Sequence, residues 1–146
     1  MITAVDTNVL LDVFSDNAEF GRRSANALRR CIAEGSLLAC DVVWAETRAW
    51  FPEAKGAENA FSRLRLDYSP LDAATALQAG CAWQAYRKAG GPRDRVIADF
   101  LIGAHATAQA DRLLTRDRGF YRSYFAELSI LDPADAPEGS RPSTPE

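Results

Sequence analysis

The stretch ITAVD at residues 2–6 places an acid directly after a short, mostly apolar run. A continuous run of this length indicates a strand buried on both faces, as in a parallel sheet. The stretch LLTRD at 113–117 repeats the arrangement, with a second acid just beyond its apolar residues. The carboxyl ends of parallel strands meet at one edge of the sheet, where open α/β proteins bind ligands. We therefore expect Asp6 and Asp117 to lie at that edge.

Strand-like and helix-like segments alternate along the chain, which is the pattern of an α/β protein with a parallel sheet. The pattern predicts strands at 2–5, 37–40, 112–115 and 128–131, and helices at about 7–14, 18–34, 42–51, 54–66, 72–89 and 94–110. Asp41 and Asp72 suit the N-caps of the helices that follow them, and Asp94 suits the cap or first turn of the last helix. The segment 67–70 reads as extended, because its final proline disfavours helix in the residue before it.

The 146 residues fit one domain, in which 47% of the residues are hydrophobic and 25% are charged. No apolar stretch approaches the roughly 20 residues that span a bilayer, and no secretion signal opens the chain, so we expect a cytoplasmic protein without a membrane segment. The three cysteines are odd in number and lack metal-binding spacing, which argues against a disulfide framework. Prolines and acids predominate from 132 onward, so we expect a folded domain at 1–131 and a disordered, acidic tail at 132–146.

The net charge of -3 lies wholly in that tail, where four acids face one arginine, so residues 1–131 carry no net charge. If four of the acids in residues 1–131 hold a metal ion, the remaining residues of this region carry a net positive charge. Lys55 and Lys88 are the only lysines among the 17 basic residues. Arginine suits bidentate contacts to phosphate, although GC-rich codon usage produces the same bias.

Two further acids fall within helix-like segments. Glu46 has apolar neighbours at helical spacing, namely Val42, Val43, Ala49 and Trp50. A carboxylate on such a face needs a metal or a paired arginine to offset its desolvation. Asp99 lies off the main apolar stripe of its helix, which is Ile97, Leu101, Ala104 and Ala108, and beside a second patch of Val96, Phe100 and Gly103. A solvated acid near a helix N-terminus explains Asp99 equally well.

Four acids that converge at one point repel each other unless a cation neutralises them. Hard divalent ions such as Mg²⁺ and Mn²⁺ take all-oxygen ligand sets of this kind. The set Asp6, Glu46, Asp99 and Asp117 therefore suggests metal-dependent phosphodiester chemistry. For Asp6 and Asp117, a capping or loop role is the alternative.

His105 is the only histidine, and no second histidine or nearby cysteine supports a zinc site, so we expect a surface or partly buried neutral role for it. Acid–base work must then rest on carboxylates, metal-bound water or substrate, which disfavours triad hydrolases and histidine-based ribonucleases. The sequence also lacks the phosphate-binding patterns G-x-x-x-x-G-K-[ST] and G-x-G-x-x-G.

Four motifs in order resemble the PIN-domain family, and within it the VapC-type toxin ribonucleases. They are VDTNVLLD at 5–12, WAET at 44–47, IADFLIGAHA at 97–106 and LLTRD at 113–117. The resemblance covers residues 1–131, approximately. It implies that this region is a PIN-like nuclease domain. It implies a three-layer α/β/α sandwich around a central parallel sheet of four or five strands. It also implies that Asp6, Glu46, Asp99 and Asp117 are the catalytic residues and the ligands of Mg²⁺ or Mn²⁺.

The resemblance further implies an endoribonuclease that cuts RNA with a metal-activated water and acts as the toxin of a type II toxin–antitoxin pair. A protein antitoxin and a second copy of the chain, in a homodimer, are the expected partners. Two alternatives stay open. One is an RNA-processing PIN nuclease outside any toxin–antitoxin system, and the other is a catalytically silent PIN scaffold that binds RNA or protein.

Several residues are candidates for supporting roles. Thr7, Asn8 and Thr115 can orient a carboxylate or a ligand water, but they also suit turns and caps. Arg116 and Arg118 flank Asp117 and either meet phosphates or are simply solvated. The segment 42–66 carries four large aromatic residues, Trp44, Trp50, Phe51 and Phe61, which form either a partner-binding surface or ordinary core.

Overall fold

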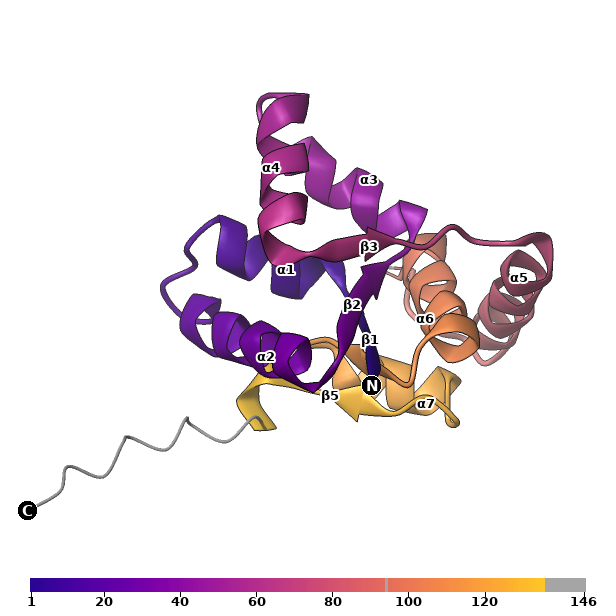
Figure 1. Ribbon diagram of the computed structural model, residues 1–146. Coiled ribbons are helices and arrows are strands. Elements are labelled where there is room, and N and C mark those ends of the chain that lie inside the picture. The colour runs from indigo at the N-terminus through magenta and orange to yellow at the C-terminus, as the bar shows by residue number, and fades with distance from the viewer. Residues whose placement is uncertain (94, 136–146) are drawn as a thin grey trace, which may run out of the picture.

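The computed structural model describes residues 1–93 and 95–135. A parallel five-stranded sheet lies at its centre in the order β3-β2-β1-β4-β5 (Figure 1). The strands are β1 (Ile2–Val5), β2 (Ser36–Ala39), β3 (Leu66–Tyr68), β4 (Arg112–Leu114) and β5 (Ile130–Leu131). The apolar run at 2–5 forms the middle strand, and its last three residues are buried, as expected for a strand covered on both faces.

Helices cover both faces of this sheet. They are α1 (Thr7–Phe14), α2 (Gly21–Glu34), α3 (Asp41–Trp50), α4 (Ala54–Leu64), α5 (Ala73–Lys88), α6 (Ile97–Gln109), α7 (Arg118–Tyr124) and the 3-10 helix η1 (Pro133–Asp135). Helices α1 and α2 lie on one side and α5 and α6 on the other, while the α3–α4 hairpin stands out from the body (Figure 1). The predicted three-layer α/β/α sandwich is therefore confirmed. Within the described ranges, none of the helices has the length and apolar character needed to cross a membrane.

The helix caps agree with the sequence in one place and differ in another. Asp72 caps α5, and its carboxylate accepts a hydrogen bond from a backbone N–H of the first turn at 2.8 Å. The prediction of Asp41 as an N-cap is wrong, because the extended residue Cys40 precedes the helix and Asp41 is its first residue. Helix α6 begins at Ile97, later than expected, and Asp94 lies outside the described residues.

Two further differences arise from short-range structure. Helix α2 begins at Gly21 and not near 18, because the side chain of Asn17 accepts hydrogen bonds from the backbone N–H groups of residues 19 and 20, both at 2.9 Å. These bonds close a turn before the helix. Helix α7 was not predicted, because its seven residues carry too little periodicity to reveal a helix.

The buried face of α6 differs from the stripe that the sequence indicated. Phe100 and Gly103 are buried, whereas Ile97 is exposed. The cause is the unpredicted helix α7, which presents Phe120 to Phe100 with ring centroids 5.1 Å apart. Asp99 therefore stands beside the true core face of its helix, at the boundary between core and solvent.

The aromatic residues of the α3–α4 hairpin mostly pack within the molecule. Trp44 lies against Phe61, with ring centroids 4.3 Å apart, and Phe51 lies 5.5 Å from Phe14 of α1. Ordinary packing therefore accounts for most of this cluster. Trp50 is the exception, since it stays 46% exposed at the end of α3.

Two glycines on neighbouring helices predict opposite effects of the same substitution. A methyl group at Gly103 would meet the ring of Phe125 at 2.4 Å, whereas one at Gly80 in α5 would have no neighbour within 4 Å. Gly103→Ala is expected to cost about 1–3 kcal/mol through overpacking. Gly80→Ala is expected to add about 0.5–1 kcal/mol, because alanine favours helix. Urea unfolding of both variants checks this pair, and equal effects would contradict the packing described.

Candidate metal centre

The predicted strand-end acids do lie at one edge of the sheet. Asp6 follows β1, and its backbone N–H donates to the carbonyl of Leu114 on β4 at 3.0 Å. The hydroxyl of Thr115 joins the two acids directly. It donates to Asp6 Oδ2 at 2.8 Å and accepts from the backbone N–H of Asp117 at 3.0 Å. One buried hydroxyl thus fixes both carboxylate-bearing segments.

Asp6 is 6% exposed and is the most deeply buried of the four acids. Its Oδ1 accepts from the backbone N–H of Thr7 at 2.7 Å, so the residue also caps α1. Its Oδ2 accepts from Thr115 and, at 3.1 Å, from the hydroxyl of Tyr121. Burial raises the pKa of Asp6 to about 6 in spite of these bonds, and the charge of Asp99 adds to the increase.

Asp99 and Asp117 share a cation. Arg95 makes two hydrogen bonds to Asp117, and its Nη1 lies 3.5 Å from Asp99 Oδ2. Burial raises the pKa of Asp99, Arg95 opposes the increase, and the charge of Asp117 adds to it. The two acids therefore lie close enough to repel each other in the absence of a cation.

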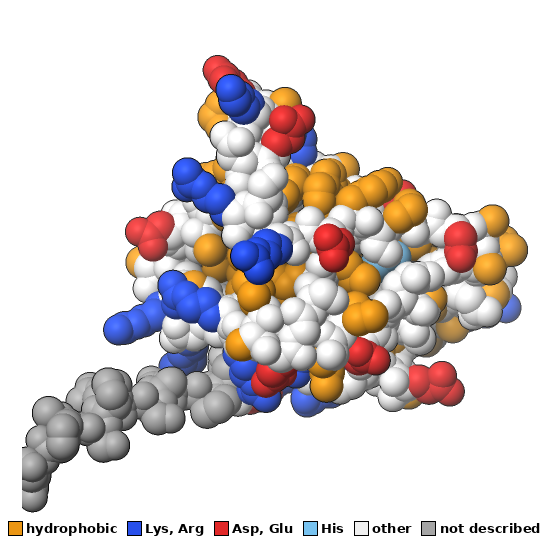
Figure 2. Space-filling model, in the orientation of Figure 1, with side chains coloured by type: hydrophobic (Ala, Val, Ile, Leu, Met, Phe, Trp, Pro, Cys, Tyr) orange, Lys and Arg blue, Asp and Glu red, His pale blue; other side chains and the backbone are white. Residues whose placement is uncertain are grey.

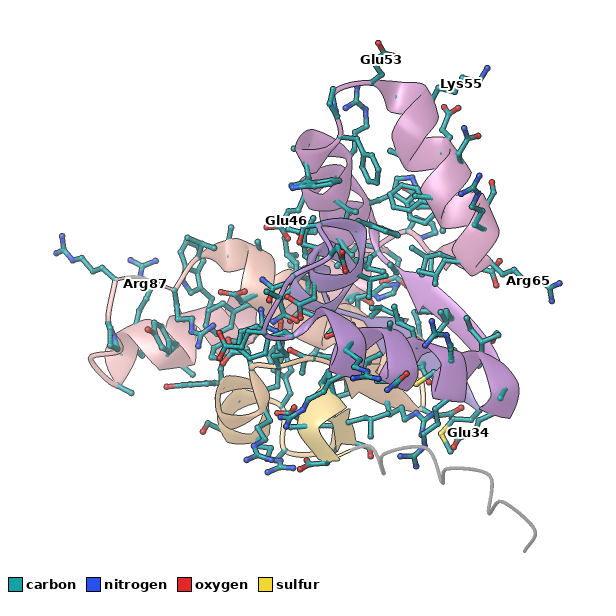
Figure 3. The ribbon with its side chains drawn as sticks, turned by 90° about the vertical axis from the view of Figure 1, so that its left-hand side faces the viewer. Glu34, Glu46, Glu53, Lys55, Arg65 and Arg87 are labelled. Atoms are coloured by element: carbon teal, nitrogen blue, oxygen red, sulfur yellow. The ribbon has the colours of Figure 1, made fainter. Side chains whose placement is uncertain are left out.

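Glu46 approaches the centre from the α3–α4 hairpin. Its Oε1 accepts from the hydroxyl of Thr7, one residue after Asp6, at 3.0 Å. Figure 3 shows Glu46 where the hairpin joins the body of the molecule. The expectation of a carboxylate on a buried apolar face is wrong, because the buried side of α3 carries Val43 and Thr47, and Glu46 is exposed.

Thr115 links Asp6 to Asp117, Arg95 links Asp117 to Asp99, and Thr7 links Glu46 to the residue next to Asp6. Tyr121 also lies near three of these acids. Burial raises the pKa of its phenol, and the charges of Asp6, Asp99 and Asp117 add to the increase. Among the residues that the structure describes, no three acid, histidine or cysteine side chains stand close enough to hold a metal ion as arranged. The donor chemistry nevertheless fits a hard divalent ion, because a guanidinium already takes a cation's place between two carboxylates.

Similarity to a known protein family decides the classification. The model of the PIN domain matches residues 3–126. The chain belongs to the PIN domain family. Curated proteins give no match to it.

Solved structures with the same fold include bacterial toxin–antitoxin proteins. VapBC2 from Rickettsia felis, bound to a DNA fragment from their promoter, has a TM-score of 0.70 at 18% identity, over 90% of this chain and 98% of that one. VapBC-1 from nontypeable Haemophilus influenzae has a TM-score of 0.68 at 17% identity, over 92% and 99%. A toxin-antitoxin complex from Klebsiella pneumoniae has a TM-score of 0.65 at 20% identity, over 90% and 97%. These likenesses establish the PIN fold of the present chain.

The arginines beside Asp117 in this PIN domain are engaged away from the centre. Arg116 makes a bidentate pair with the buried Asp12, at 2.7 and 3.1 Å, and its backbone N–H donates to Asn8 at 3.4 Å. Arg118 pairs with Asp135 of η1 at 3.1 Å. Neither guanidinium pairs with the quartet, as we call Asp6, Glu46, Asp99 and Asp117 together. The cation that does pair with it is Arg95, which the sequence did not single out.

Two residues of the centre escaped the sequence reasoning. Arg95 stands four residues before Asp99, a spacing that suits an ion pair but is shared by many solvated residues. Tyr121 stands four residues after Asp117 in the unpredicted helix α7. His105, by contrast, is more deeply buried than expected and hydrogen-bonds Ser69 at 2.9 Å. Burial lowers its pKa, in keeping with the predicted neutral form.

The raised pKa of Asp6 predicts how the metal-free PIN domain responds to pH. The folded-state pKa is about 6, against 3.8 for a free aspartate. Above pH 6 the buried charge costs the fold about 3 kcal/mol, for a shift of about two pKa units. As the pH falls through 6 toward 4, the folded chain takes up a proton that the unfolded chain does not, so this penalty disappears. The stability of the wild type relative to Asp6→Asn is expected to rise over that interval.

Urea unfolding in EDTA at pH 7 and pH 4.5 measures that change. Asn also alters the hydrogen bonds to Thr115 and Tyr121, so the informative quantity is the change in the stability gap with pH. Asp67→Asn, an exposed acid on β3, serves as the control and is expected to show no such change. A gap between wild type and Asp6→Asn that stays constant would contradict the buried, raised carboxyl.

Proposed function

We propose that this PIN domain is a Mg²⁺- or Mn²⁺-dependent endoribonuclease and the toxin of a type II toxin–antitoxin pair. The observation that carries the proposal is the meeting of Asp6, Asp99 and Asp117 from three separate segments at one sheet edge, with Glu46 held beside them. Burial of Asp6 raises its pKa, and the nearby charge of Asp99 adds a smaller increase, so the arrangement carries a cost in a metal-free protein. Acids with a purely structural role would not need a buried charge that lowers the stability of the metal-free fold.

The proposed reaction is hydrolysis of a phosphodiester. A water oxygen forms a bond to phosphorus and gives up a proton, while the bond from phosphorus to the 3′ oxygen breaks and that oxygen takes up a proton. A divalent ion, when bound, supplies charge neutralisation and Lewis-acid polarisation of the phosphate. Thr115 and Tyr121 hold Asp6 Oδ2 in one orientation, and the hydroxyl of Thr7 holds Oε1 of Glu46. These bonds preorganise the carboxylates before substrate arrives.

A basic groove along α2, whose lining includes none of the four acids, supports a polyanionic substrate. Arg22, Arg29 and Arg30 of α2 line a groove of about 1110 Å³. Figure 2 shows Lys and Arg side chains gathered on the side of the molecule that carries α2 and α4. Nucleic-acid binding begins with such contacts to phosphate, so we assign the groove to the RNA backbone beyond the cleaved bond.

The test is cleavage of RNA by the purified full chain with Mn²⁺ and with EDTA, followed by analysis of the product ends. Attack by water leaves a 5′-phosphate and a 3′-hydroxyl. Products that end in a 2′,3′-cyclic phosphate would overturn the proposed reaction. RNA that binds but stays intact would favour the silent scaffold.

A protein antitoxin is the proposed partner. Its support is the occurrence of this fold in toxin–antitoxin structures, together with the exposed Trp50 at the tip of α3. Co-expression with the product of a small upstream gene, followed by sizing and a growth assay, tests the pairing and a homodimer at once. A chain that is monomeric, harmless when expressed alone and without a binding neighbour would favour an RNA-processing nuclease.

A further inference from the structure

A guanidinium occupies the acidic centre. Arg95 donates from Nη2 to Asp117 Oδ1 at 3.1 Å and from Nη1 to Asp117 Oδ2, and its Nη1 lies 3.5 Å from Asp99 Oδ2. The side chain thus takes both oxygens of one carboxylate and reaches a second carboxylate. An ion coordinated by Asp117 must use the same oxygens, and two cations at one carboxylate repel each other.

Arg95 differs from the arginines around it. Arg116 is committed to Asp12, and Arg118 is committed to Asp135. Within the part of the chain that the structure describes, Arg95 alone among the basic side chains forms an ion pair with a member of the quartet. The acidic centre therefore has its own counter-ion, supplied by the segment that leads into α6.

The position of Arg95 lets it leave the carboxylates and still stay beside them. Its guanidinium carbon lies 4.2 Å from the centre of the Phe120 ring, a cation–π contact that holds the side chain at the rim. The side chains of Arg95 and Asp117 are 27% and 35% exposed, so ions and substrate reach both. Rotation of the arginine stem is enough to release Asp117, because no backbone movement is needed to turn a long side chain.

We propose that Arg95 is a built-in counter-ion of the metal centre, which a divalent ion displaces and which then binds a phosphate oxygen of the RNA. The proposal rests on the proposed nuclease function. The released guanidinium is a planar set of donors that lacks acceptors, at a partly exposed position beside Asp117. Phosphate matches that donor pattern with two parallel hydrogen bonds. Arg95 is thus a positioning residue for metal and substrate in turn.

The metal step is tested without RNA. The electron paramagnetic resonance signal of free Mn²⁺ measures binding by the full-length wild type, Arg95→Gln and Arg93→Gln. Arg93 is exposed in the same loop, so its substitution removes an equal charge. Arg95→Gln is expected to bind Mn²⁺ about 10-fold more tightly than the wild type. Arg93→Gln is expected to resemble the wild type. Unchanged or weaker binding by Arg95→Gln would overturn the proposal.

A second variant guards against a folding defect. Arg95→Lys keeps the charge but loses the two-pronged contact, so Mn²⁺ should bind it with an intermediate affinity. In EDTA, Arg95→Gln should melt below the wild type, and Mn²⁺ should raise its melting temperature by more than it raises that of the wild type. An equal rise in all variants would count against displacement of Arg95.

The substrate step is tested at saturating Mn²⁺. Arg95→Gln is expected to raise KM by about 10-fold and to change kcat less, because it removes a contact to bound phosphate. Arg95→Lys should recover part of the loss. An unchanged KM would overturn the phosphate contact. The two proposals fail in different ways. A wild type that binds no Mn²⁺ would refute the proposed nuclease. Equal Mn²⁺ affinities of the wild type and Arg95→Gln would refute only the role of Arg95 as a counter-ion.

Discussion

Asp6→Asn is expected to lower the rate of RNA cleavage by at least about 100-fold while leaving the fold intact. Losses of about 10- to 100-fold are usual even for groups that only support a metal ligand, so removal of a ligand should cost more. The fold survives because a neutral side chain at this buried position relieves a desolvated charge. Cleavage with Mn²⁺ and thermal melting in EDTA, measured on the same preparation, separate the two effects.

Asp117→Asn should behave in the same way, because Thr115 ties both residues to one position. Asp67→Asn removes an exposed acid from β3 and should leave cleavage unchanged. Full activity of both Asp6→Asn and Asp117→Asn would refute the assigned centre. Unfolding of both in EDTA would instead show that these acids are structural.

Arg116→Gln is expected to lower stability by about 3 kcal/mol, because it leaves a buried carboxylate without its partner. Asp12 is only 4% exposed in its side chain, and Arg116 supplies two of its hydrogen bonds. Arg116 also lies 4.0 Å over the ring of Phe20, a contact that the substitution removes. For a chain of this length, the melting temperature should fall by about 6–12 °C.

Arg118→Gln is the matched control. Its pair with Asp135 is exposed on both sides, at 47% and 50%, and such pairs contribute about 0–1 kcal/mol. The contrast decides between two roles for Arg116. If it mainly contacts RNA, Arg116→Gln would melt like Arg118→Gln and bind RNA more weakly. If it mainly joins α1 to the loop after β4, the loss appears in stability.

The sequence predicts four of the five strands and the positions of Asp6 and Asp117 in the metal centre, because these features depend on local sequence patterns. Strands and the acids that follow them are local patterns, so residues 2–6 and 113–117 carry enough information to place Asp6 and Asp117 at one edge. Asp72 as a helix cap is likewise a local property. The environment of Glu46 could not be predicted, because whether a helix face is buried depends on what packs against it.

The residues that sequence reasoning missed depend on contacts between distant segments. Arg95 reaches Asp117 across 22 positions, and Tyr121 reaches Asp6 across 115. Helix α7 is too short to show a period, yet it supplies both Tyr121 and the ring on which Arg95 lies. The reassigned core face of α6 has the same origin. Local patterns therefore located the acids, and tertiary packing determined what neutralises and orients them.

Titration of the metal-free full chain with Mn²⁺, in parallel with Asp6→Asn and Asp117→Asn, tests most directly whether these acids form one metal centre. The account predicts saturable binding by the wild type and at least about 10-fold weaker binding by each variant. Binding that is equal in all three proteins, or absent from the wild type, would contradict it.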